Sequence, residues 1–362
     1  MLPPRRFDFF LFLPIVFLLG IGVFILASVA PANLSTHLLY VFISLCFFFF
    51  FSLLDLEIIF PFSPFVYVFS LFFLMLPLFL GTAVRGSARW ISLGQFTIQP
   101  SEIVKPLTAL IFAWYWARRK VSLRNIFFAF LIFIPIVILI FFQPDLGSSL
   151  AVASIFIGCL LATPLKMKHI LVFLAIFLLT APTLWFSLKD YQKYRVVHFL
   201  NPYSDPLGKG YNLIQAKISV GSGKLFGRGF GRGTQSHLAF LPERYTDFVF
   251  ASLTEEIGFL GGSIILVLYF WLFSRMFRIA SRSLTAYAND KFFFLLSIGI
   301  IFYLSFQVLV NIGMNLGLLP ITGIPLPLVS YGGSSLVSTM ISLGILESIA
   351  NRFNREETLE IK

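Results

Sequence analysis

Charged residues are scarce in this 362-residue sequence, where Asp, Glu, Lys and Arg together make up 12%. A soluble globular domain carries about one-quarter charged residues. Hydrophobic residues make up 58%, which is more apolar surface than a soluble core of this length can hide, whereas lipid would cover it. The scarcity of charge therefore excludes a soluble enzyme and predicts an all-α integral membrane protein.

Cysteine is almost absent, and the two cysteines, Cys46 and Cys159, each lie inside an apolar run. This excludes a disulfide framework and a zinc cluster. No cluster of His, Asp and Glu has the spacing of metal ligands either, so the sequence assigns no metal site. The glycines of residues 221–233 match neither a P-loop nor a dinucleotide-binding fingerprint. They predict either a backbone that approaches an anion closely or a flexible turn.

Ten apolar stretches approach the length of about 20 residues that a membrane-spanning helix needs. They lie at 9–30, 37–54, 64–81, 102–117, 125–142, 148–163, 168–186, 248–274, 292–316 and 330–350. Residues 1–362 are therefore predicted to form one transmembrane domain of about ten helices, with residues 187–247 as a long extracytoplasmic loop between the seventh and the eighth. The first stretch is longer than a signal-peptide core, so we expect it to be retained.

The positions of the cations predict the orientation. When the ten spans are threaded from a cytoplasmic N-terminus, the cations of the short loops gather on the cytoplasmic side, as the positive-inside rule requires. They are Arg5, Arg6, Arg118, Arg119, Lys120, Arg124, Lys166, Lys168, Arg275, Arg278, Arg282, Lys291, Arg352, Arg355 and Lys362. Both termini are thus expected in the cytoplasm. The positive-inside pattern also explains much of the formal charge of +11. No nucleic-acid partner is therefore expected.

The predicted loop 187–247 is basic although it lies on the opposite side. It carries Lys189, Lys193, Arg195, Lys209, Lys217, Lys224, Arg228, Arg232 and Arg244. Long loops are translocated regardless of charge, so the orientation stands. A basic surface over a bilayer attracts phosphate-bearing lipid substrates, and simple contact with anionic membrane lipid is an equally good explanation.

Asp247 stands where the polar end of this loop turns into the eighth apolar stretch. A carboxylate at the membrane boundary, beside Arg244, can act as a general base on a substrate hydroxyl. The alternative is that Asp247 only caps its helix and favours the helix dipole. Glu255 and Glu256 lie about 12 Å deeper at 1.5 Å per residue, and we expect neither to share the face of Asp247.

Three further polar segments are predicted on the same outer side. Residues 81–106 contain Glu102 and Lys105, which are spaced to pair with each other on a helix and are candidates because ionisable groups inside a span are costly. Residues 143–145 (Gln-Pro-Asp) are expected to form an Asx-type turn. Residues 323–336 are broken by Pro and Gly, as is tolerated where backbone lines a cavity. Together with the Asp247 loop, these segments predict one outer site.

Five motifs in this order resemble the SEDS family (shape, elongation, division and sporulation), the RodA/FtsW/SpoVE group of peptidoglycan polymerases. The motifs are RWISLGQFTIQPSEIVKP (89–106), QPDLGSS (143–149), GKGYNLIQAKISVGSGKLFGRGFGRGTQ (208–235), LPERYTDFVFASLTEEIGFLG (241–261) and LPLVSYGGSS (326–335). The similarity extends from the first predicted helix to the last. Within the family, the run 315–335 is more similar to the elongation enzyme RodA than to FtsW. Tyr245 departs from the His that often precedes Thr-Asp-Phe in relatives.

The resemblance implies a glycosyltransferase that polymerises lipid II, the undecaprenyl-pyrophosphate-linked disaccharide-pentapeptide, on the outer face of the bacterial cytoplasmic (inner) membrane. This activity would serve cell elongation and rod shape. The family's essential aspartate corresponds to Asp247, which would take the proton of the acceptor hydroxyl. Pyrophosphate is a good leaving group that cations can stabilise. The residues assigned to the substrate are Lys105, Glu102, Arg195, Arg244, Arg85, Arg89, Lys217, Ser330 and Ser334.

The resemblance also implies a class B penicillin-binding protein, a transpeptidase, as partner within the elongation machinery, in addition to lipid II and membrane lipid. The sequence requires no cofactor, and a divalent cation, Mg²⁺ or Mn²⁺, could assist the leaving group. The alternatives are a lipid II flippase, an FtsW-like division polymerase and a non-catalytic scaffold. A proton-coupled transporter would need ionisable groups near the middle of the membrane, and the predicted spans carry few.

Overall fold

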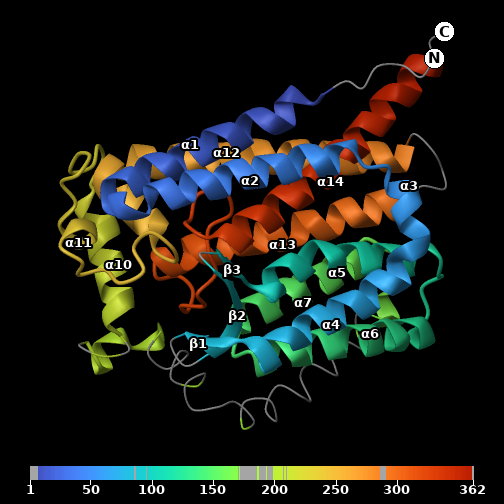
Figure 1. Ribbon diagram of the computed structural model, residues 1–362, viewed down its shortest axis with the longest axis horizontal. Coiled ribbons are helices and arrows are strands. Elements are labelled where there is room, and N and C mark those ends of the chain that lie inside the picture. The colour runs from blue at the N-terminus through green and yellow to red at the C-terminus, as the bar shows by residue number, and fades with distance from the viewer. Residues whose placement is uncertain are drawn as a thin grey trace.

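Helices dominate the computed structural model, which describes residues 7–84, 87–94, 96–169, 171, 186, 193, 199–206, 208, 210–285 and 291–360 (Figure 1). In chain order the elements are α1 Phe9–Val29, η1 Pro31–Asn33, α2 Leu34–Leu53, α3 Leu56–Ile59, η2 Phe60–Phe62, α4 Ser63–Leu80, β1 Thr82–Val84, β2 Ser87–Leu93, β3 Phe96–Ile98, α5 Pro100–Ala117, α6 Leu123–Phe142, α7 Leu146–Leu161, η3 Pro202–Ser204, α10 Tyr211–Ser222, α11 Thr234–His237, α12 Val249–Thr285, α13 Lys291–Asn315 and α14 Gly333–Glu360. Most of the predicted seventh span, 168–186, and of the adjoining loop lies outside the described residues.

The other nine predicted spans coincide with helices α1, α2, α4, α5, α6, α7, α12, α13 and α14. Among the described residues, seven segments are long and apolar enough to cross a membrane: Phe9–Val29, Pro31–Leu53, Leu56–Leu80, Leu123–Phe142, Val249–Leu284, Lys291–Asn315 and Gly333–Phe353. Helices α5 and α7 are not among these segments: α7 has only 16 residues, and α5 carries the charged Glu102 and Lys105. The prediction of an all-α, multi-pass membrane protein is confirmed, while the count of ten spans stays a prediction.

Helices α13 and α14 form the centre of the bundle. In their most apolar stretches 72% and 83% of the residues are buried, against 17% in the segment Leu56–Leu80. The large side chains of that outer segment point away from the protein, for example Phe65 and Phe79, which are 72% and 77% exposed. Such a surface is stable only against lipid, so the outer helices face the membrane and the central ones hold the polar contacts.

The start of α1 and the end of α14 lie at the same end of the bundle, opposite α10 and α11 (Figure 1). At this end Asp8 caps α1 and binds the guanidinium of Arg275, with Nη2 2.5 Å from Oδ2. The N–H of Asp8 donates to Glu347 Oε1 at 2.8 Å. This buried cluster ties α1, α12 and α14 together. Which end faces the cytoplasm stays a prediction.

A small antiparallel sheet, β1-β2-β3, lies near the opposite end of the bundle (Figure 1). Thr82 pairs with Trp90, and Ile91 pairs with Ile98. The sequence predicted only a polar segment here. The sheet carries Arg89 on its middle strand and passes directly into α5, whose first residue is Pro100, a position where the missing N–H of proline costs nothing.

Helix α12 is broken at Gly258, whose φ of 79° and ψ of −166° are not helical. The glycine-rich loop 223–231 fills the break with backbone hydrogen bonds. The N–H groups of Arg228 and Gly229 donate to the carbonyls of Glu255 and Glu256, both at 2.9 Å. The glycines of this loop therefore serve close packing, since the N–H of Gly229 is occupied by the helix, that of Gly227 by the Gly223 carbonyl and that of Gly231 by the Ser28 hydroxyl. A Cβ at Gly227 would lie 2.0 Å from the Glu256 carbonyl oxygen.

The two glutamates beside the break are buried and bind the polar segment in front of α12. Glu255 accepts the N–H groups of Gln235 and Ser236 at 2.8 and 2.9 Å. Glu256 accepts the hydroxyl of Ser28 at 2.5 Å and lies 2.9 Å from His237 Nε2. Their role is thus to dock segment 234–237 on α12, which offsets the cost of burying two carboxylates.

Candidate active site

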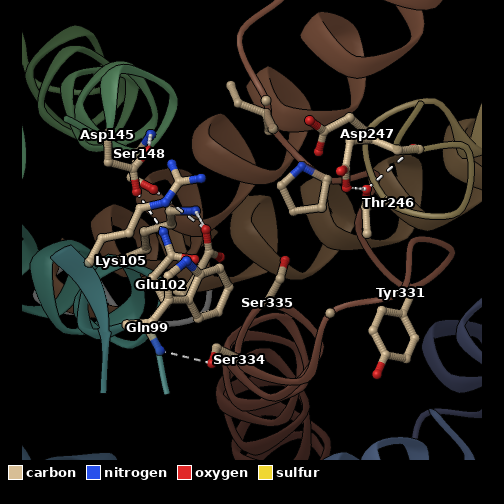
Figure 2. A pocket seen from close by; sticks show the side chains of 17 residues that line it. Gln99, Glu102, Lys105, Asp145, Ser148, Thr246, Asp247, Tyr331, Ser334 and Ser335 are labelled. Atoms are coloured by element: carbon tan, nitrogen blue, oxygen red, sulfur yellow. Dashed lines mark hydrogen bonds and ion pairs between the residues drawn. The ribbon is translucent and has the colours of Figure 1, made fainter. Parts of the chain in front are cut away.

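A cavity of about 270 Å³ lies among the starts of α5, α7 and α12 and the segment that precedes α14 (Figure 2). Its lining consists of Arg89, Trp90, Gln99, Glu102, Lys105, Asp145, Ser148, Glu243, Thr246, Asp247, Gly323, Ile324, Pro325, Tyr331, Gly332, Ser334 and Ser335. The four polar segments that the sequence analysis selected therefore meet at one place.

Lys105 and Glu102 form the charged centre of one wall. Lys105 Nζ lies 2.5 Å from Glu102 Oε1, and the two side chains are only 2% and 6% exposed. The carbonyl of Glu102 accepts the Ser338 hydroxyl at 2.6 Å, which fastens α5 to α14. Burial of an ammonium group is costly unless the group is paired, so the ion pair with Glu102 offsets the cost of burying Lys105.

Asp145 organises the rest of that wall. Its Oδ2 accepts Gln99 Nε2 at 2.6 Å and the Ser101 hydroxyl at 2.9 Å. Its Oδ1 accepts the N–H of Ser148 at 3.1 Å and so caps α7. The sequence predicted only a turn at this position. The available signal was an acidic residue directly before a helix in an otherwise apolar region, and it was attributed to the turn alone.

Asp247 belongs to the opposite wall, directly in front of α12, and is half-buried. Figure 2 shows Asp247 and Thr246 on one side of the cavity and Lys105, Glu102 and Asp145 on the other. A Cβ at Gly323 would lie 3.5 Å from Asp247 Oδ2, so the chain passes close to this carboxylate. The φ of 73° at Gly323 favours glycine there.

The segment before α14 and the first turn of that helix connect the two walls. The Ser334 hydroxyl accepts the Gln99 N–H at 3.0 Å and donates to the Thr97 carbonyl at 3.2 Å. The Ser330 hydroxyl donates to the Thr246 carbonyl at 2.5 Å. Ser334 thus holds the β3–α5 junction, and Ser330 holds the residue before Asp247.

The predicted site residues fall into three groups: those that line the cavity, those that are described but lie outside its lining, and those outside the described residues. Asp247, Glu102, Lys105, Arg89 and Ser334 all line the cavity.

Arg244, Lys217 and Ser330 are described but do not belong to the lining. Arg244 is half-buried, and Lys217 is exposed on α10, where its side chain packs against Gly317. Arg85 and Arg195 lie outside the described residues. Sequence reasoning also missed Gln99, Ser148, Glu243 and Tyr331, which line the cavity and lie next to motif residues that it did select.

Carboxylates outnumber cations in the described lining: Glu102, Asp145, Glu243 and Asp247 stand against Lys105 and Arg89. Tyr331 adds no charge near neutral pH. Burial, and then the neighbouring phenols of Tyr40 and Tyr245, raise the pKa of Tyr331 above its ordinary value. The wall with Lys105 can hold an anionic group, and the wall with Asp247 can accept a proton.

Within the described residues, no group of three or more His, Cys, Asp and Glu side chains has an arrangement that could hold a metal ion. The cavity carboxylates are nevertheless oxygen donors of the kind that Mg²⁺ and Mn²⁺ prefer, and one or two suffice when phosphate oxygens and water complete the shell.

Comparison with known families finds the same family that the five sequence motifs resemble. The cell cycle protein family model FTSW_RODA_SPOVE matches residues 7–355. The peptidoglycan glycosyltransferase MrdB of Escherichia coli K12 is 43% identical over 291 residues, covering 79% of this chain and 77% of that protein. The stage V sporulation protein E of Bacillus subtilis is 36% identical over 299 residues, covering 81% and 80%.

Solved structures agree with these relatives. A chain from a study of how a peptidoglycan synthase complex coordinates polymerization and crosslinking superimposes with a TM-score of 0.84 at 32% identity, covering 97% of this chain and 98% of that one. The rod shape determining protein RodA of Thermus thermophilus gives a TM-score of 0.71 at 28% identity, covering 96% and 97%.

Proposed function

We propose that this chain, which belongs to the FtsW/RodA/SpoVE family, polymerises lipid II into glycan strands with Asp247 as the general base. It is a peptidoglycan glycosyltransferase of the SEDS type, and its relatives support a role in cell elongation. One observation supports the proposed chemistry above all: the Asp247 carboxylate and the buried Lys105 ammonium line opposite sides of the same cavity.

The reaction we propose is a displacement at the anomeric carbon of the donor N-acetylmuramic acid. The 4-hydroxyl oxygen of the acceptor N-acetylglucosamine forms the new bond to that carbon and loses its proton to Asp247. The bond between the carbon and the phosphate oxygen breaks, and undecaprenyl pyrophosphate leaves with the bonding electrons. Because pyrophosphate leaves as a stable anion, no carboxylic acid is needed to protonate it, in contrast to a typical inverting glycosidase.

Lys105 and Arg89 are the cations we assign to the pyrophosphate inside the cavity, because both belong to its lining. Preorganised positive charge at a leaving group that gains negative charge lowers the barrier without reorganisation. Glu102 orients Lys105 through their ion pair. Arg244 and Lys217 do not line the cavity, and we assign to them, with Arg85 and Arg195, the attraction of the anionic substrate to this end of the protein.

A divalent cation fits the chemistry of the lining, because the carboxylates outnumber the cations and the substrate adds more negative charge. Mg²⁺ or Mn²⁺ would supply charge neutralisation at the pyrophosphate when bound. Glu102 and Asp145, on the wall next to Lys105, are the residues that would contribute oxygens. A polymerisation assay with and without a chelator, followed by return of Mg²⁺ or Mn²⁺, tests this part of the proposal.

The environment of the enzyme follows from its charge pattern and its relatives. We propose that the cavity opens on the outer face of the bacterial cytoplasmic membrane, with both termini in the cytoplasm. The similarity to a chain of a synthase complex that couples polymerization to crosslinking supports a transpeptidase partner, which we infer to be a class B penicillin-binding protein.

The experiment is lipid II polymerisation by the purified protein in liposomes, alone and with its transpeptidase. We expect glycan strands to appear and to lengthen with time. A parallel assay follows the movement of intact lipid II between the two leaflets. Transport of intact lipid II without any polymer would contradict the proposal and support a flippase instead.

A further inference from the structure

The four residues that end with Asp247 are held by their main-chain carbonyls. The carbonyl of Arg244 accepts the Ser252 hydroxyl at 2.8 Å. The carbonyl of Tyr245 accepts the Tyr331 N–H at 2.9 Å, and that of Thr246 accepts the Ser330 hydroxyl at 2.5 Å. The three residues before the candidate base are thus fastened to α12 itself or to the segment before α14.

The carbonyl of Asp247 is held by two asparagines of α13. Asn311 Nδ2 donates to it at 2.9 Å, and Asn315 Nδ2 donates to it at 3.0 Å. Both asparagines are completely buried, at 0% exposure. A buried carboxamide is costly unless its hydrogen bonds are made, so two of them directed at one carbonyl form a specific contact.

Asn315 caps the start of α12 with its side chain. The first bond of this helix runs from the N–H of Ser252 to the carbonyl of Phe248, so the N–H of Ala251 belongs to the first turn and has no partner within the helix. Here the N–H of Ala251 donates to Asn315 Oδ1 at 3.0 Å, while Nδ2 of the same carboxamide donates to the Asp247 carbonyl. The side chain of Asn315 therefore bonds both an N–H of the first turn and the carbonyl of Asp247 in front of it, and so fixes the start of α12 relative to α13.

Asn311 adds a link across the cavity. Its Nδ2 donates to the carbonyl of Ile324 at 2.8 Å as well as to that of Asp247. Ile324 and Asp247 both belong to the lining, and a Cβ at the neighbouring Gly323 would lie 3.5 Å from the Asp247 carboxylate. Asn311 thus sets the spacing between the base and the backbone that faces it.

We propose that Asn311 and Asn315 are positioning residues, which place the Asp247 carboxylate for proton abstraction without touching the substrate. The inference rests on the proposed function, because positioning matters only if Asp247 is the base. Both asparagines come from α13, one of the two central helices of the bundle, so a well-buried helix fixes the position of the base. A misplacement of about 1 Å in a reacting geometry can cost about 100-fold in rate.

The test compares the near-isosteric variants Asn311→Leu and Asn315→Leu with a matched control, Gln307→Leu. Gln307 is also buried on α13, at 1% exposure, one turn before Asn311, and does not line the cavity. We expect kcat for lipid II polymerisation to fall about 10- to 100-fold in each asparagine variant, with KM within about twofold of the unmodified protein. The control should keep both constants, because Gln307 Nε2 makes no hydrogen bond within the described part of the chain.

Other results would separate the positioning role of the asparagines from the role of Asp247 as the base. If the asparagine variants kept the kcat of the control, or raised KM alone, the positioning role would be refuted even if Asp247→Asn abolished turnover. If Asp247→Asn itself kept the normal kcat, the proposed base would be wrong instead. Should neither asparagine variant fold, Ser330→Ala removes the hydroxyl that donates to the Thr246 carbonyl and accepts the Leu326 N–H, and should lower kcat about threefold to tenfold. An unchanged kcat in that variant would count against the inference.

Discussion

The Lys105 ammonium and the Glu102 carboxylate face each other one turn apart on α5, with Nζ 2.5 Å from Oε1 and both side chains almost fully buried. This pair lines the cavity opposite Asp247. Two opposite charges at this distance stabilise each other only as long as both are present. The pair therefore links the stability of the bundle to the charge that the proposed mechanism needs.

Replacement of Lys105 by Met should affect stability and activity together. The variant leaves the Glu102 carboxylate buried without its cation, which typically costs about 3–5 kcal/mol. The cavity also loses the ammonium group assigned to the pyrophosphate. We expect a lower unfolding temperature of the detergent-solubilised protein and a large loss of lipid II polymerisation.

The double variant Glu102→Gln/Lys105→Met separates the two effects. It removes both charges, so we expect most of the thermal stability to return. Turnover should stay low, because the leaving group loses the buried ammonium and, of the cations in the described lining, keeps Arg89 alone. Recovery of normal turnover in this variant would show that the Lys105 charge has only a structural role.

Replacement of Asp145 by Ala should destabilise the protein more than loss of an ordinary helix cap. The variant removes the cap of α7, worth about 1 kcal/mol, and deprives the buried Gln99 and Ser101 side chains of their acceptor, at about 1–3 kcal/mol. The matched control is Asp55→Ala, which removes the exposed cap of α3. Equal shifts of the unfolding temperature in the two variants would contradict the organising role of Asp145.

Gly258→Ala should disrupt the break in α12. The residue has a φ of 79°, and an added Cβ would lie 2.3 Å from the backbone nitrogen of Gly227. Backbone strain of this kind costs about 1–3 kcal/mol before the clash is added. Thermal unfolding measures the effect, and Gly20→Ala is the control, because nothing lies within 4 Å of that position in α1. If both variants unfolded at the same temperature, the break would not depend on glycine.

Much of the fold could be predicted from composition and hydrophobic length. The stretches around α1, α2, α4 and α6 are long and nearly free of charge, and in a membrane such a stretch has no stable alternative to a helix. The sheet at 82–98 could not be predicted in this way, because its strands are three to seven residues long and mixed in polarity. The break at Gly258 was hidden because its backbone partners come from residues 223–231.

The site could be predicted only where a residue is chemically unusual for its surroundings. A lysine and a glutamate inside an apolar stretch, and an aspartate at its boundary, attract attention by their cost alone. Asn311 and Asn315 give no such signal, because an uncharged amide in an apolar helix is ordinary in sequence. Their significance depends on the register between α13 and the start of α12, which only the three-dimensional structure contains.

The most direct test of the proposed mechanism is the turnover of the Asp247→Asn protein with lipid II, measured on folded protein in the presence of its transpeptidase. The asparagine keeps the shape of the side chain and removes only its ability to accept the hydroxyl proton. We expect kcat to fall about 10²- to 10⁴-fold, as for the loss of a general base, with little change in unfolding temperature. Normal turnover in this variant would contradict the mechanism and leave Asp247 with a structural role at the start of α12.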